Sequence, residues 1–365
     1  MLDEIRERCE LLINNRKAIA KGFSFEKELM SIVAAMIFTG AGREADVEKL
    51  KECKKILAKH TGLFSKFRKY VDLVLESRMA LSEDPERYIE DLVDTYNKLR
   101  KSKMKENDFT IIAAMLLCDL GKTDKTDEVM ERYAEIIKRM KKEHPFLTDT
   151  TDSSYVMLLA ISERDIESII SDMEECIGYL NETCKTKAGA DAIQGMGEVL
   201  ALEGGDIKAK CDRVDKIFGL FKEKKAGFSG DREFVSLGAL ADIDAEEETL
   251  VDQIMEAAEI LKGDKGFADN SVDKSRRLMY AATLVADCYR ESSEADDNTL
   301  ISSTLGILKD QETAAVISAM IQMLPSVLGA FINSETGTDS VSLSTDSADG
   351  AGSTSISANS AGTNV

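Results

Sequence analysis

Four acidic residues occupy similar places in this sequence, because each one ends a run of mostly apolar residues. They are Asp119, Glu203, Asp242 and Asp287. If the runs are helices stacked in register, the four carboxylates lie along one rim, where they could bind a divalent cation or a cationic peptide, or supply an acid/base pair. The macrodipole disfavours a carboxylate near a helix C-terminus, so these four are the candidate catalytic residues. The alternative is that they mark a turn or cap the next segment.

A second candidate site lies near the middle of the chain, in the segment KKEHPFLTDTTDSSY (141–155). His144, Asp149 and Asp152 combine an imidazole with two carboxylates, which could bind a ligand, hold a metal or move a proton. However, aspartate commonly caps helices, and His144 stands beside Pro145 where a helix must end. We favour this structural interpretation and predict no metal site.

A third candidate is the adjacent pair Arg276 and Arg277, which could bind an anionic ligand. Basic residues at the start of a helix oppose its dipole, so they need carboxylates or a bound anion. Ion pairs with Asp269 or Asp273 would satisfy them within the chain.

The usual signatures of enzymes and cofactor sites are incomplete in this sequence. Gly121-Lys122-Thr123 resembles the end of a P-loop, but Leu116 stands where its first glycine belongs. The two histidines are far apart in the sequence, and no two of the seven cysteines have the CxxC spacing. We therefore predict no cofactor and no disulfide framework, and we leave open whether the protein is an enzyme.

Seven apolar runs provide the elements that would position these residues. They are LMSIVAAMIFTG, YVDLVLESRMALS, TIIAAMLLCD, SYVMLLAIS, AIQGMGEVLALE, EFVSLGALAD and LMYAATLVAD. The first and last runs end in polar residues at Thr39 and Asp287, which are 248 positions apart. The mean spacing of about 41 residues is typical of two-helix repeats.

The segments between the apolar runs are amphipathic. Val129, Tyr133, Ile136 and Met140 form one stripe of a helix, for example. Helices that are apolar all round must be covered on both sides, whereas striped helices can face water. The sequence therefore predicts an all-α fold of about seven two-helix repeats, arranged as an α-solenoid or an α/α toroid. We expect a curved array, open or closed, with the helical-repeat domain spanning residues 1–310.

The C-terminal region has a different composition. Residues 314–332 carry no charge, and we expect residues 311–333 to form an apolar packing helix. A membrane anchor through 314–332 is the alternative, because this run is about long enough to cross a bilayer. Residues 334–365 are rich in Ser, Thr and Gly and should form a disordered tail.

The net charge of −20 is distributed unevenly along the 365 residues. Residues 147–333 contain 18 Lys and Arg against 36 Asp and Glu, whereas residues 1–146 are nearly balanced. Such an acidic region repels phosphate backbones, so we expect no nucleic-acid partner. Seven scattered cysteines and a charged N-terminal segment that cannot be a secretory signal predict a cytoplasmic protein.

Three stretches resemble an uncharacterised bacterial family, the domain of unknown function 4003. They are VEKLKECKKILAKHTGLFSKFR (47–68), MKKEHPFLTDTTDSSYVMLLA (140–160) and RRLMYAATLV (276–285), and the similarity covers about residues 5–290. The resemblance implies a cytoplasmic protein of the Firmicutes type without an assigned activity. It supplies no catalytic residues.

Two functions fit these observations. The first is a helical-repeat scaffold that binds a protein or peptide, as repeat architectures commonly do. The second is an α/α-toroid enzyme or small-ligand binder that uses an acidic inner rim. We favour the scaffold because no complete catalytic signature is present.

Overall fold

A computed structural model describes most of the chain between residues 1 and 292. It leaves out the segments 25–27, 62–71, 102–107, 144–152, 185–187 and 229–230, the single positions 120 and 163, and everything after 292. The chain divides into two compact units, Met1–Val327 and Leu328–Val365, and all described residues belong to the first. The expected packing helix (311–333) and disordered tail (334–365) therefore lie outside the described residues.

The described residues form α-helices and no strand, which confirms the predicted all-α class. Seven helices have odd numbers: α1 (Leu2–Gly22), α3 (Val47–His60), α5 (Pro85–Lys101), α7 (Thr126–Glu143), α9 (Ile166–Thr183), α11 (Ile207–Glu223) and α13 (Glu247–Lys262). Seven have even numbers: α2 (Glu28–Gly40), α4 (Asp72–Leu81), α6 (Asp108–Asp119), α8 (Ser153–Ile161), α10 (Ala190–Glu203), α12 (Asp231–Ser236) and α14 (Lys274–Ser292). Two short 3₁₀ helices, η2 (Thr123–Lys125) and η3 (Leu237–Leu240), complete the described elements.

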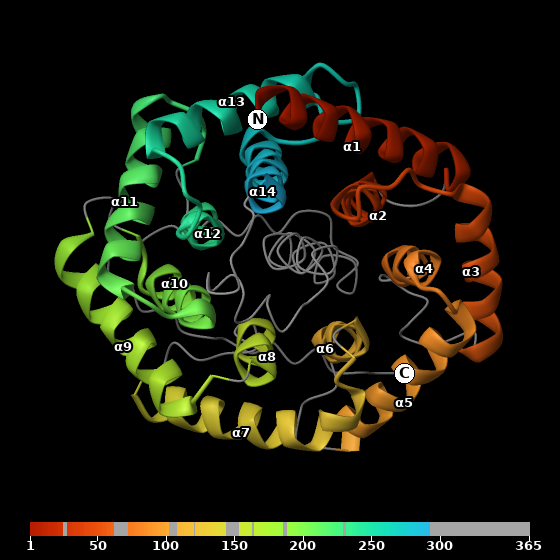
Figure 1. Ribbon diagram of the computed structural model, residues 1–365, viewed down its shortest axis with the longest axis horizontal. Coiled ribbons are helices and arrows are strands. Elements are labelled where there is room, and N and C mark those ends of the chain that lie inside the picture. Colours follow the sequence, from red (N-terminus) through yellow and green to blue (C-terminus); the bar gives the residue numbers. More distant parts are fainter. Residues whose placement is uncertain are drawn as a thin grey trace, which may run out of the picture. The chain divides into compact units, whose positions relative to one another are not determined.

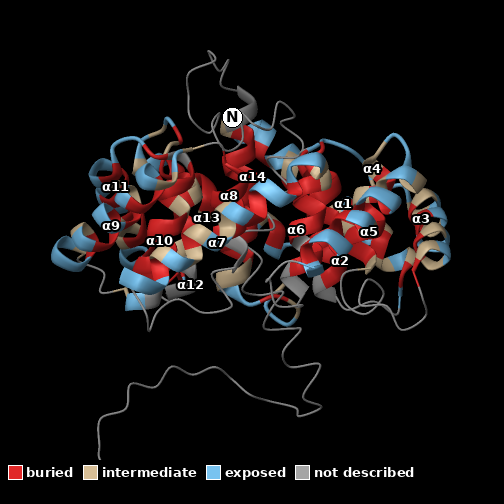
Figure 2. Ribbon diagram, turned by 90° about the horizontal axis from the view of Figure 1, so that it is seen from below, coloured by how far each residue is buried: buried red, intermediate tan, exposed pale blue. Residues whose placement is uncertain are grey.

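The odd-numbered and even-numbered helices differ in how they are buried. Helix α3 buries only Leu50, Cys53 and Leu57, which lie on one face, and its lysines are partly or fully exposed. In contrast, every residue of α14 from Arg277 to Cys288 is buried, over more than three turns. Figure 2 shows exposed residues along odd-numbered helices such as α3, α9 and α11. The sequence distinction between striped and wholly apolar helices is therefore a distinction between outer and inner helices.

Within the first unit, the odd-numbered helices surround the even-numbered ones (Figure 1). Most odd-numbered helices pack against the even-numbered helix that follows, and α11 packs against η3. Successive odd-numbered helices also contact one another from α1 to α13. Finally, α1 contacts both α13 and α14, so the first and last described helices pack together.

Arginine and lysine side chains stabilise the C-terminal ends of the inner helices. Arg8 of α1 donates from Nη1 to the Thr39 carbonyl of α2 over 2.6 Å. Arg132 of α7 donates to the carbonyls of Ala160, Ser162 and Arg164 at the end of α8. The last carbonyls of a helix lack hydrogen-bond donors within it and carry partial negative charge. These cations supply both a donor and a compensating positive charge.

Polar contacts fix the packing of α1 against α13 and the turn that follows it. Lys17 Nζ lies 2.7 Å from Asp264 Oδ2, and Arg6 Nη2 lies 3.6 Å from Glu256 Oε1. Asp264 is only 9% exposed and also accepts from the Gly266 amide. A Cβ at Gly266 would lie within 2.4 Å of the Arg16 guanidinium, so a side chain at this position would displace Arg16.

We predict that Asp264→Asn lowers the free energy of unfolding by about 1–2 kcal/mol, because it weakens a partly buried, charge-assisted hydrogen bond. Urea denaturation of the full chain measures this change. Asp252→Asn is the matched control, because its ion pair with Lys224 involves a carboxylate that is 63% exposed. If both substitutions changed the free energy of unfolding equally, the contact of α1 with the end of α13 would contribute little to stability.

The same variant should change the pH dependence of stability. Burial alone would raise the pKa of Asp264, but the Lys17 ammonium, the Gly266 amide and Arg16 outweigh burial and hold this pKa below its usual value. A depressed pKa stabilises the folded state above the unfolded pKa of about 4, and this contribution is lost as the pH falls through the folded pKa. The stability difference between wild type and Asp264→Asn should therefore shrink below about pH 4.

Candidate functional site

The expected rim carboxylate Asp119 is the last residue of α6. Its side chain contacts the inner helix α4 and the outer helix α5. Its Oδ1 lies 3.0 Å from Arg78 Nη2 of α4 and accepts a 2.8 Å hydrogen bond from the Tyr88 hydroxyl of α5. The Asp119 side chain is only 1% exposed and that of Arg78 is 10% exposed. Three helices therefore meet at one buried ion pair.

The pKa shifts of Tyr88 and Arg78 favour a structural role for this cluster over a role in proton transfer. Burial raises the pKa of the Tyr88 hydroxyl well above its usual value, and the Asp119 charge raises it further, so Tyr88 stays a neutral donor. Burial alone would lower the pKa of the Arg78 guanidinium, but Asp119 and Tyr88 raise it overall. The contacts with Arg78 and Tyr88 fix the Asp119 side chain in place.

The other expected rim residues differ in their surroundings. Asp242 Oδ2 lies 2.5 Å from Nζ of Lys210, a largely buried lysine of α11. Asp287 is buried, and it does not end its helix as expected, because α14 continues to Ser292. Glu203 is the last residue of α10, and its side chain is outside the described set. In the described parts of the chain, none of the four belongs to a group of three or more potential metal ligands.

The structure shows how the arginine pair is satisfied. Arg277 is 1% exposed, and it donates to the carbonyls of Phe267 (2.8 Å) and Val272 (3.1 Å) and to Asp269 Oδ1 (2.7 Å). Arg276 Nε lies 3.2 Å from Asp273 Oδ2. These are the ion pairs that the sequence offered as the alternative to ligand binding. Arg277 thereby fastens the α13–α14 connection to the start of α14.

The central segment with His144, Asp149 and Asp152 falls outside the described residues, so its role remains a prediction.

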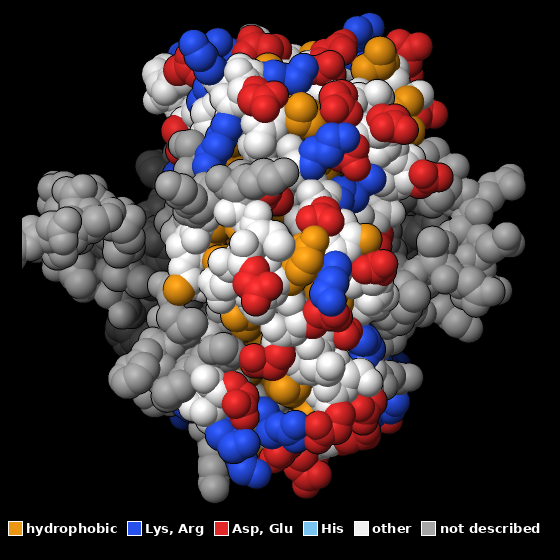
Figure 3. Space-filling view, turned by 90° about the vertical axis from the view of Figure 1, so that its left-hand side faces the viewer, with side chains coloured by type: hydrophobic (Ala, Val, Ile, Leu, Met, Phe, Trp, Pro, Cys, Tyr) orange, Lys and Arg blue, Asp and Glu red, His pale blue; other side chains and the backbone are white. Residues whose placement is uncertain are grey.

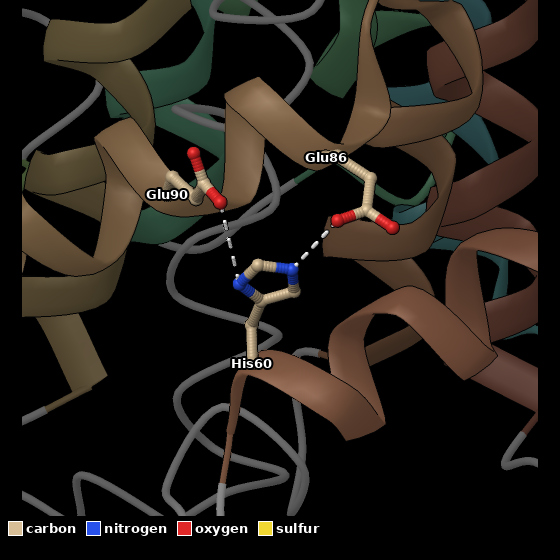
Figure 4. Close-up of side chains that lie close together, drawn as sticks. All are labelled: His60, Glu86 and Glu90. Atoms are coloured by element: carbon tan, nitrogen blue, oxygen red, sulfur yellow. Dashed lines mark hydrogen bonds and ion pairs between the residues drawn. The ribbon is translucent and has the colours of Figure 1, made fainter.

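A cluster that sequence reasoning missed joins the end of α3 to the start of α5 (Figure 4). His60 Nε2 lies 2.9 Å from Glu86 Oε2, and His60 Nδ1 lies 4.0 Å from Glu90 Oε1. Lys59 Nζ also pairs with Glu86 at 3.0 Å. Glu86 and Glu90 are four residues apart and so share one helix face. Only the packing of α3 against α5 brings His60 to them, and no sequence spacing reports that contact.

The contacts already present in this cluster disfavour a metal ion. One ligand atom from each of His60, Glu86 and Glu90 lies within 4.8 Å of the others, which is a possible ligand set for a divalent cation. However, each ring nitrogen faces a different carboxylate, and a metal ion would have to displace Lys59 from Glu86. Hydrogen bonds from His60 and Lys59 lower the pKa of Glu86, so its carboxylate stays charged. As described, the polar contacts of this cluster link the outer helices α3 and α5.

The inner helix α10 contains a further polar pair. Gln194 Nε2 donates to Glu198 Oε1 over 3.0 Å, and the two residues are 1% and 0% exposed. Among the described residues, Gln194 Oε1 has no hydrogen-bond donor. Burial of a carboxylate beside an amide is costly and needs compensation. The signal available in the sequence was a polar pair four residues apart within an apolar run.

We predict that Arg78→Met destabilises the protein by about 3–5 kcal/mol, because it leaves the Asp119 carboxylate buried without its cation. The double variant Arg78→Met/Asp119→Asn should lose clearly less than the sum of the single losses in urea unfolding, since it also removes the charge. Arg87→Met is the control, because Arg87 is 80% exposed and should change stability by no more than about 0.5 kcal/mol. Additive single losses would refute a structural pairing.

The chain resembles a described protein family and a bacterial protein. The family model described as "Protein of unknown function (DUF4003)" matches residues 15–323. An uncharacterised protein of Bacillus subtilis strain 168, YeaA, is 25% identical over 150 residues, which are 40% of this chain and 45% of YeaA. The match thus spans less than half of that relative, and no solved structure matches. Because the family model covers most of the chain, the protein belongs to the DUF4003 family of unknown function.

Proposed function

We propose that residues 1–310 form about seven two-helix repeats closed into an α/α toroid, and that the protein is an interaction scaffold of the bacterial cytoplasm. The alternation of outer and inner helices supports the repeats. The contacts between successive outer helices, together with the contact of α1 with α13, support closure over an open solenoid. No helix in the described parts of the chain is both long and apolar enough to span a membrane, and residues 314–332 are outside those parts.

The observation that carries the scaffold function is the uneven charge of the outer helices. Helix α9 contains five carboxylates and no Lys or Arg, whereas α3 contains five Lys and two Glu. These two helices lie on opposite sides of the first unit (Figure 1). An acidic helix on the outer face is suited to a basic protein segment.

The nature of the exposed surface also limits the kind of partner. Leu2 is the one large hydrophobic side chain that is exposed among the described residues. On the face in Figure 3, acidic and basic side chains are interspersed and hydrophobic ones are scattered. Large exposed apolar patches mark interfaces that form by hydrophobic contact. Because the apolar side chains on this face are scattered, it would recognise a partner by charge and hydrogen bonds. We therefore propose a Lys- and Arg-rich peptide or protein segment as the partner.

A fluorescence-anisotropy titration with a short, unstructured Lys-rich peptide tests this proposal. Glu174→Lys/Glu182→Lys on α9 should weaken binding by at least about tenfold, because each reversal removes an attraction and adds a repulsion. Glu48→Lys/Glu52→Lys on α3 makes the same change of net charge and should have a much smaller effect. Equal losses in both variants would mean that only the total charge of the chain matters, which would refute an α9 docking surface.

The buried pair Gln194 and Glu198 favours a second function, binding of a small polar ligand among the inner helices. A ligand that donates to Gln194 Oε1 would supply the missing hydrogen bond. Native mass spectrometry of the purified full chain would then show a retained small mass that Glu198→Gln and Gln194→Leu remove. A bare chain in which Gln194→Leu is as stable as the wild type would leave the scaffold as the sole proposal.

A further inference from the structure

Two cysteine thiols face each other between neighbouring outer helices. Cys176 of α9 and Cys211 of α11 are 35 positions apart, and their Sγ atoms lie 3.4 Å from each other. Both side chains are fully buried and both thiols are reduced. A disulfide requires an S–S distance of about 2.05 Å, so the two sulfur atoms are about 1.4 Å too far apart for a bond. Side-chain rotation and a slight approach of the helices would close that gap.

Polar contacts fix the register of the two helices on both sides of the thiols. Glu175 Oε1 lies 3.2 Å from Lys208 Nζ, and the Tyr179 hydroxyl donates to Asp212 Oδ1 over 2.9 Å. The Cys184 thiol lies 3.3 Å from Asp215 Oδ1 further along. The partners advance together along both helices, so α9 and α11 run in the same direction and hold the two thiols opposite each other.

We propose that Cys176 and Cys211 are a modification site, which a small disulfide such as oxidised glutathione converts to a cross-link between α9 and α11. The thiolate of one cysteine attacks the small disulfide, forms a mixed disulfide and releases one small thiolate. The second cysteine gives up its proton and attacks the protein sulfur of that mixed disulfide, which releases the second small thiolate. The protein dithiol is oxidised and the small disulfide is reduced to two thiols.

Burial controls when this exchange occurs. The hydrogen bond that Cys176 shares with the Cys211 thiol and desolvation both raise the pKa of Cys176, so Cys176 is almost never a thiolate while the helix pair is closed. The reagent also cannot reach sulfur atoms that are fully buried. Exchange therefore requires local separation of α9 and α11, and the cross-link, once formed, keeps the helices together.

The test incubates the full chain with oxidised glutathione at a urea concentration below the unfolding transition, then alkylates free thiols and maps disulfide-linked peptides. We expect a Cys176–Cys211 cross-link as the main product, with a higher melting temperature that dithiothreitol reverses. Cys176→Ala and Cys211→Ala should each abolish both changes, whereas Cys53→Ala, which removes a buried thiol of α3, should retain them.

Two results would overturn the proposal. One is stable glutathionylation of Cys176 or Cys211 without the cross-link, which would show that the sulfur atoms do not reach bonding distance. The other is a cross-link that forms only above the unfolding transition and pairs the seven cysteines indiscriminately, which would show that the helix pair does not select this product.

Discussion

The inner helices depend on cations supplied by other helices and turns. A helix that is buried on all sides cannot satisfy its last carbonyls with water, and those carbonyls carry the negative end of the macrodipole. Arg8, Arg132 and Arg213 of three outer helices donate to the carbonyls that end, or follow, α2, α8 and η3. Arg164, which precedes α9, donates to the Ala201 carbonyl near the end of α10. Each of these contacts links one part of the array to the next. The inner helices can therefore pack only where a neighbour also supplies hydrogen bonds to their last carbonyls.

The same constraint explains the carboxylates that first suggested chemistry. Asp119 ends α6 and Asp242 lies in the turn just after η3, and each is placed against a cation of the same chain, Arg78 or Lys210. Because the Asp119 pair is buried, the carboxylate is as necessary to Arg78 as the cation is to Asp119. An unfavourable position in a sequence can thus indicate a partner in the fold, and it need not indicate a substrate.

The difference between local and distant contacts decides how much the sequence could predict. The period of the apolar residues gave the helical class and separated inner from outer helices, because burial follows from a local pattern. The ion pairs of Arg277 and Arg276 involve Asp269 and Asp273, which are close in sequence, and they were accessible in the same way. The contacts His60–Glu86, Arg78–Asp119 and Cys176–Cys211 join residues 26, 41 and 35 positions apart. Such contacts depend on which helices become neighbours, and no local spacing records that.

The contact of α1 with α13 has a consequence for the synthesis of the chain. Ile5, Cys9 and Leu12 are fully buried in the finished unit, and the Cys9 thiol reaches the Ala257 carbonyl. The ribosome adds about 5–20 residues per second, so roughly 10–50 s separate the emergence of α1 from that of α13. During that interval part of the apolar stripe of α1 has no final neighbour. Helix α1 is made well before α13 but is completely covered only after α13 has emerged, so the exposed part of its stripe would need protection from aggregation during that interval.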